Sequence, residues 1–128
     1  MSVPPDLCVA PEATVRQTLE AITRSGRQIA LVVQSDGRLA GIVTDGNVRK
    51  ALLKGVSLDA PVVEAMNRSP ILGWPGMERA EAVELMRSRS IRHLPIVDRA
   101  GRLVDLVFLD EHIQPAPLPS PAVIMAGG

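Results

Sequence analysis

The chain has 128 residues, and its 14 basic and 14 acidic side chains leave no net charge at pH 7. A neutral chain lacks the positive excess that nucleic-acid-binding proteins use, so we expect no nucleic-acid partner. No apolar run is long enough to span a bilayer, and Pro4 and Pro5 interrupt the place where a signal peptide would begin. Cys8 is the only cysteine, so an internal disulfide is excluded. These features predict a cytoplasmic protein without a membrane partner.

The first half of the chain predicts a helix, a hairpin and a second helix. Val15, Leu19 and Ile22 recur at helical spacing, so we expect a helix from Glu12 to Ser25. Aliphatic runs on either side of the turn at Ser35–Arg38 predict a hairpin. The expected strands and the second helix, capped by Asn47, cover residues 29–33, 39–43 and 47–53.

The second half predicts the same order of elements. A helix is expected over residues 78–90, with Ala82, Val83 and Met86 facing inward, and a hairpin is expected around the turn at Asp98–Gly101. The other expected elements are a short helical turn at 61–66, strands at 71–72, 94–97 and 103–108, and a short terminal helix at 110–113.

The two halves are copies of one unit. Residues 11–47 align without a gap with residues 75–111, at an offset of 64, and Gly37–Leu39 falls on Gly101–Leu103. Neither copy alone is large enough to bury a satisfactory core, so the copies must pack together. We predict an α+β fold of two pseudo-symmetric β-α-β-β-α units, with the functional surface at the seam between them.

Three segments carry a resemblance to a known family. Gly41–Asn47 (GIVTDGN) resembles the Gly-h-h-Thr/Ser-x-x-Asp signature of cystathionine-β-synthase-type (CBS) domains, where h is an apolar residue. Ile91–Asp98 resembles the strand entry of that family, and Pro61–Asn67 resembles the segment that opens a repeat. The resemblance covers roughly residues 7–113 and implies a tandem CBS pair, or Bateman module. We assign residues 1–57 to one repeat and 58–113 to the other.

The resemblance implies clefts that bind adenosine nucleotides such as AMP, ADP or ATP, with no cofactor required, and that regulate an attached protein. The physical chemistry of the motif agrees, since a hydroxyl at Thr44 before a helix N-terminus suits a phosphate, and the Asn47 amide suits ribose hydroxyls. The alternative is that Thr44 and Asn47 only cap the helix. The predicted ligand-binding residues are Thr44, Asp45, Asn47, Arg92, His93, Pro95, Asp110 and Glu111.

The second copy departs from the family pattern. Phe108 replaces Thr44, Glu111 replaces Asn47, and Asp105 replaces Gly41 at the offset of 64, so the second motif is expected to be degenerate, with Phe108 filling its cleft. Arg92 and His93 have no charged counterparts in the first copy. We therefore expect one composite site, or one weak site. A surface salt bridge for Arg92 and a partly buried, hydrogen-bonded imidazole for His93 are the alternatives.

The last residues differ in character. Residues 114–121 contain four alternating prolines, which predicts a semi-rigid linker. Residues 122–128 (AVIMAGG) resemble the opening strand and glycine loop of sugar-phosphate nucleotidyltransferases of the mannose-1-phosphate guanylyltransferase type. This resemblance implies that the module regulates such an enzyme, whose domain would be its partner. The chain carries no catalytic set and is not expected to be an enzyme by itself.

A second function is left open by the degenerate motif. The clefts could bind nothing, and the chain would then serve only as a ligand-blind dimerisation module. CBS pairs commonly form homodimers through their helical faces. The faces that bear Ala21, Ala51, Ala82 and Met86 are the candidates for that contact.

Overall fold

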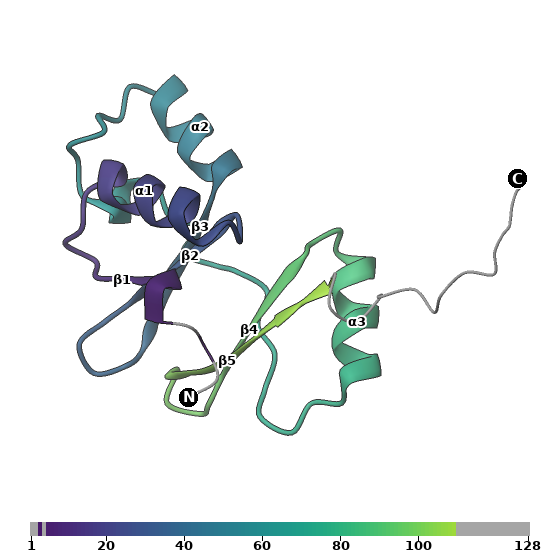
Figure 1. Ribbon diagram of the computed structural model, residues 1–128. Coiled ribbons are helices and arrows are strands. Elements are labelled where there is room, and N and C mark those ends of the chain that lie inside the picture. Colours follow the sequence, from purple (N-terminus) through teal and green to yellow (C-terminus); the bar gives the residue numbers. More distant parts are fainter. Residues whose placement is uncertain (1–2, 4, 110–128) are drawn as a thin grey trace, which may run out of the picture.

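The structure is a computed structural model that describes residue 3 and residues 5–109. It has two units of helices packed on small sheets, which confirms the α+β class and the two repeats (Figure 1). The elements of the first unit are η1 Pro5–Leu7, β1 Cys8–Val9, α1 Val15–Ser25, β2 Ile29–Val33, β3 Leu39–Thr44 and α2 Asp45–Leu53. Those of the second are η2 Val62–Glu64, α3 Arg79–Ser88, β4 His93–Val97 and β5 Leu103–Phe108.

In the first repeat, β2 is the central strand of a three-stranded sheet. It pairs in parallel with β1 and antiparallel with β3. Because successive residues of a strand point to opposite faces, Ala30 and Val32 face α1 and α2, while Ile29 and Leu31 face the seam. Both faces of β2 are thus covered, which explains its continuous aliphatic sequence.

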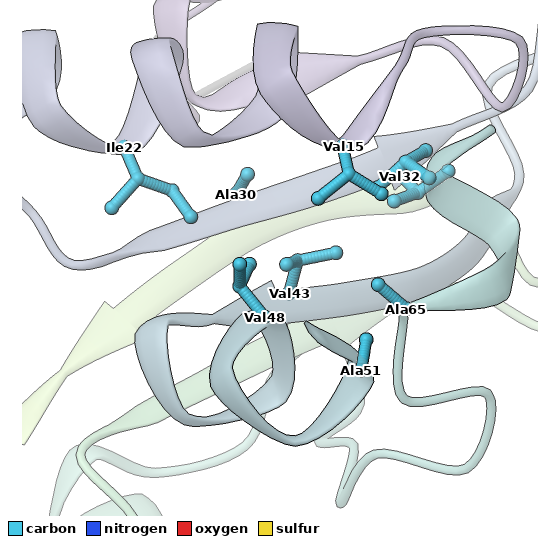
Figure 2. Close-up of a cluster of buried hydrophobic side chains, with 9 residues drawn as sticks. Val15, Ile22, Ala30, Val32, Val43, Val48, Ala51 and Ala65 are labelled. Carbon is cyan, nitrogen blue, oxygen red and sulfur yellow. The ribbon is translucent and has the colours of Figure 1, made fainter. Parts of the chain in front are cut away.

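The core under the two helices is built from small aliphatic side chains (Figure 2). Val15 and Ile22 reach down from α1, and Val48 and Ala51 reach in from α2. Ala65, which belongs to the segment after α2, closes the same cluster. The backbone of that segment also binds the first turn of α1, because the Ala60 carbonyl accepts the Val15 N–H at 2.9 Å.

Helix starts differ from the sequence expectation for a local reason. The first helix begins at Val15 because the Thr14 side chain caps it, and Gln17 completes a capping box. The second helix begins at Asp45, with Thr44 as its N-cap, so the prediction that Asn47 is the cap was wrong. A threonine and an asparagine three residues apart can both bind backbone amides, and the structure uses them reciprocally.

The second repeat is smaller. Among the described residues its sheet contains two strands, β4 and β5. The prediction of a strand at residues 71–72 was wrong, because the backbone makes a single parallel bridge at this edge, between Gly73 and Ile96. That bridge is the counterpart of the Val9–Val32 pair at the offset of 64. Proline and glycine, at 70 and 73, disfavour a longer strand. The terminal helix expected at 110–113, the linker and the tail lie outside the described residues.

The seam between the repeats has an approximate twofold symmetry. The Leu39 N–H donates to the Gly101 carbonyl, and the Leu103 N–H donates to the Gly37 carbonyl, both at 2.9 Å. These two bonds exchange under the offset of 64, so the sequence repeat is also a spatial one. Beneath them, Ile29, Leu31, Leu103 and Leu106 form a shared buried cluster.

The symmetry offers a matched test of backbone strain. Gly26 and Ser90 are equivalent and both are left-handed, with φ of 71° and 56°. Serine is strained in this region whereas glycine is not, and no atom lies within 4 Å of a Cβ built on Gly26. We expect Ser90→Gly to raise the free energy of unfolding by about 0.5 kcal/mol and Gly26→Ser to lower it by about 0.5–1 kcal/mol. Urea unfolding measures both, and changes of the same sign in the two variants would contradict this account.

Candidate functional site

A pocket of about 310 Å³ lies at the seam, where β3 ends and β4 begins. It has walls from both repeats, because β3 belongs to the first and the turn before β4 belongs to the second. The lining residues are Ile42, Thr44, Asn67, Ser69, Pro70, Ile71, Ser90, Ile91, Arg92 and His93. The volume is near the lower end of the range for small-molecule sites.

Thr44 caps α2, as one of the two interpretations predicted, and it also faces the pocket. Its Oγ1 accepts the Asn47 N–H at 3.3 Å, and its own N–H donates to Asn47 Oδ1 at 2.9 Å. The same threonine side chain lines the pocket. Asn47 does not line this pocket but a separate hollow of about 220 Å³ between α2 and η2. The hydrogen bonds with Asn47 therefore fix Thr44, although Asn47 itself does not line the pocket.

Residues 67–71 form the wall of the pocket opposite the turn before β4. Asn67 is held to β3 by two backbone hydrogen bonds, with Ile42 N–H donating at 3.1 Å and Asn67 N–H donating at 2.7 Å. Asn67 Oδ1 then accepts the Ser69 N–H at 3.0 Å, which turns the chain. The close approach requires Gly41, because a Cβ there would lie 2.7 Å from the Asn67 carbonyl oxygen.

Arg92 and His93 enter from the turn between α3 and β4. Ser90 begins this turn in a left-handed conformation, and Arg92 is exposed while His93 is half-buried. His93 Nε2 lies 3.2 Å from the Arg27 carbonyl oxygen, so a hydrogen bond joins this histidine to the first repeat. The alternative of a half-buried, hydrogen-bonded imidazole thus holds for His93, and it also lines the pocket.

The described part of the pocket suits an anion with an apolar portion. Arg92 carries a positive charge, and Thr44, Ser69 and Ser90 supply hydroxyl groups. The other walls are aliphatic, from Ile42, Pro70, Ile71 and Ile91. Among the described lining residues there is no carboxylate that would repel a phosphate.

The structure brings together only part of the predicted residue set. Thr44, Arg92 and His93 meet in one pocket. Asp45 is exposed and is not among the pocket residues, and Pro95 is fully buried. The remaining two predicted residues, Asp110 and Glu111, lie outside the described residues.

Sequence reasoning missed most of the 67–71 wall. The sequence indicates only a break at residues 67–70, after the short helical turn at 61–66, and a strand at 71–72. A usable signal existed in Gly41, because a glycine inside a strand indicates that another backbone approaches closely. The partner of that approach, however, cannot be identified from sequence spacing.

At the equivalent place in the second repeat, Arg27 and Phe108 line a separate pocket of about 690 Å³. Phe108, which stands where Thr44 stands in the first repeat, packs on the buried seam cluster. The Arg27 guanidinium carbon lies 4.6 Å from the centre of its ring, and the His93 ring meets it edge-on with a centroid distance of 5.4 Å. That Phe108 fills the second cleft stays a prediction, since Phe108 also lines this pocket.

Other chemistry-bearing groups in the described part of the chain form neither a reactive thiol nor a metal site. Burial raises the pKa of the Cys8 thiol, and the Asp6 carboxylate raises it further, so this cysteine is a poor nucleophile. Within residue 3 and residues 5–109, no three His, Cys, Asp or Glu side chains cluster as metal ligands. No helix in the same part of the chain has the length and apolar character that crossing a bilayer requires.

The family is established by comparison with known proteins. The CBS domain family profile matches residues 1–54 and again residues 56–111. The chain belongs to the CBS domain family, whose tandem pairs are nucleotide-binding regulatory modules.

Two solved structures are similar to this chain over most of its length. A CBS domain protein from Pyrobaculum aerophilum, solved in complex with AMP, is 25% identical, with a TM-score of 0.74 over 87% of this chain and 85% of that one. The cytosolic domain of the Mg²⁺ channel MgtE, solved with ATP, is 26% identical, with a TM-score of 0.70 over 86% of this chain and 45% of that one.

Curated relatives are much longer than this chain. Arabinose 5-phosphate isomerase KdsD of Yersinia pestis is 33% identical over 107 residues, which is 83% of this chain and 32% of that protein. Inosine-5'-monophosphate dehydrogenase of Aquifex aeolicus is 28% identical over 83% of this chain and 21% of that protein. The chain therefore spans about a third or less of the length of these relatives.

Proposed function

We propose that this module binds one adenine nucleotide in the pocket between its repeats and thereby regulates an attached enzyme. The observation that carries the proposal is that Thr44, from the first repeat, and Arg92 and His93, from the second, line the same pocket. A ligand that touches both repeats stabilises one arrangement of the seam and can transmit its presence beyond the pocket. Relatives of this fold solved with AMP and ATP support an adenine nucleotide.

The chemistry of the pocket favours a monophosphate. An aliphatic wall suits the face of a purine, and Arg92 with the Thr44 hydroxyl suits one phosphate group. Among the described lining residues, only Arg92 carries a permanent positive charge, so these residues would leave most of the charge of a triphosphate uncompensated. We expect AMP to bind more tightly than ATP.

A thermal shift series tests the proposal. AMP at 100 times its dissociation constant is expected to add about 2.7 kcal/mol to the free energy of unfolding, which raises the melting temperature by roughly 10 °C. ADP, ATP, GTP and S-adenosylmethionine at the same concentration should shift it less. No shift with any of the five, together with flat calorimetric titrations, would refute ligand binding.

The identity of the attached enzyme is a separate proposal. Similarity of residues 122–128 to a nucleotidyltransferase opening strand supports a sugar-phosphate nucleotidyltransferase. The two curated relatives give this no support, since they are an isomerase and a dehydrogenase. Assays of the natural protein for sugar-1-phosphate nucleotidyl transfer and for arabinose 5-phosphate isomerisation distinguish the two activities. A cytoplasmic location stays a prediction from the sequence.

The ligand-blind dimerisation module is the second candidate, and the loss of the second motif at Phe108 favours it. The contact faces expected from the sequence were wrong, because Ala21, Ala51, Ala82 and Met86 are all buried within the chain itself. Leu53 is 82% exposed at the end of α2 and is a better candidate for a contact. Light scattering with and without AMP separates the two functions, since a dimer that ignores AMP would support the scaffold.

A further inference from the structure

We propose that Phe108 and Arg27 are positioning residues that hold the His93 ring in one orientation and one tautomer for the ligand pocket. The inference rests on the proposed function, because it concerns a residue of the same pocket. His93 lines that pocket, whereas Phe108 and Arg27 do not. They line a different pocket, of about 690 Å³, so any effect of these two residues on binding beside Thr44 must pass through another group.

The first contact is between rings. His93 and Phe108 stand directly opposite each other on β4 and β5. Their ring centroids are 5.4 Å apart and their planes meet at 80°, which is the favourable edge-to-face arrangement. Phe108 is held in turn by the Arg27 guanidinium, whose carbon lies 4.6 Å from the centre of the phenyl ring, within cation–π range.

The second contact is a hydrogen bond that selects the tautomer. His93 Nε2 lies 3.2 Å from the Arg27 carbonyl oxygen, and a carbonyl oxygen can only accept. The bond therefore exists only when Nε2 carries a proton. In the neutral ring this makes Nδ1 the acceptor, so the tautomer is set by Arg27 while the ring plane is set by Phe108.

The repeat symmetry shows what has been exchanged. The pair equivalent to His93 and Phe108 is Ile29 and Thr44, which also face each other on β2 and β3. The first repeat thus presents a hydroxyl opposite an aliphatic side chain, and the second presents an imidazole opposite a phenyl ring. Phe108, which replaces the threonine of the CBS motif in the second repeat, is therefore also the residue that packs against His93 of the pocket.

The test compares Phe108→Leu with Phe108→Tyr in the complete chain. Loss of the ring is expected to weaken AMP binding about fivefold to tenfold, while tyrosine, which keeps the ring, retains the wild-type affinity within about twofold. Nitrogen-15 NMR of the His93 ring should show a single Nε2–H tautomer in the wild type and in Phe108→Tyr, and a mixture in Phe108→Leu. An unchanged tautomer and an unchanged affinity in Phe108→Leu would overturn the proposal.

Two further measurements keep the outcome decisive. If Phe108→Leu fails to fold, Arg27→Gln removes the cation that holds the phenyl ring. The backbone carbonyl of residue 27 stays, but the His93 ring loses its fixed plane, so the same loss of affinity and of tautomer purity is expected. If the wild type binds no AMP, the proposed function fails, and the tautomer spectra alone then decide the positioning role. A mixed tautomer in the wild type would overturn it.

Discussion

Arg92→Ala is expected to bind AMP about 10- to 100-fold more weakly than the wild type while unfolding at nearly the same urea concentration. A hydrogen bond to a charged group contributes about 1.5–3 kcal/mol, which corresponds to this range of affinity. Arg92 is exposed at the mouth of the pocket, so its loss removes little from the core. Isothermal titration calorimetry measures the affinity, and urea unfolding measures the stability.

Two controls make the Arg92 result specific. Arg16→Ala removes an arginine whose ion pair with Asp59, at 3.5 Å, is exposed and lies away from the pocket residues, so affinity should be unchanged. Arg92→Lys keeps the charge but loses the planar fork, and an intermediate affinity is expected. Equal AMP affinity in the wild type and in Arg92→Ala would remove this residue from the site.

Gly41→Ala is expected to lower the free energy of unfolding by about 1–3 kcal/mol and to weaken AMP binding at the same time. A Cβ at this position would lie 2.7 Å from the Asn67 carbonyl oxygen and 2.8 Å from Met66 Sδ. The sulfur can move, but the carbonyl belongs to the backbone that bridges to Ile42. The wall at 67–71 must therefore shift away from β3, and urea unfolding with AMP calorimetry measures both consequences.

Gly46→Ala is the matched control for this substitution. Gly46 lies in α2, and the nearest atom to an added Cβ is Thr44 Oγ1 at 3.8 Å, an ordinary contact. Alanine is favoured over glycine in a helix, so this variant should be more stable by about 0.5–1 kcal/mol. Equal stability of Gly41→Ala and the wild type would show that the wall is not held as described.

Much of the fold could be predicted because most elements expected in one copy of the repeat are also expected at the equivalent place in the other. The offset of 64 aligns Gly37 with Gly101 in the sequence. In the structure, reciprocal backbone hydrogen bonds join the two turns that contain these glycines. The continuous burial of β2 follows from its unbroken aliphatic sequence, and the end of α1 follows from the left-handed Gly26. A strand was predicted at residues 71–72 because both residues are apolar, but neither of them pairs with a neighbouring strand. Ile71 lines the pocket and Leu72 is 39% exposed.

The candidate site was predictable only where a motif carries it. Thr44, Arg92 and His93 were identified from local patterns, and they meet in space. Asn67, Ser69 and Ser90 were not identified, because their place in the pocket depends on a backbone bridge to Ile42 and on a left-handed turn. The dimer faces were misjudged for a related reason, since helical periodicity cannot show which of two apolar helix faces the rest of the chain covers.

The most direct test of a single composite site is an amide NMR titration of the chain with AMP. The account predicts saturable shifts at one equivalent of AMP per chain, at both Ile42–Thr44 and Ser90–His93. Shifts confined to one repeat, shifts centred on Gln28 beside the second cleft, or no saturable shift would each contradict it.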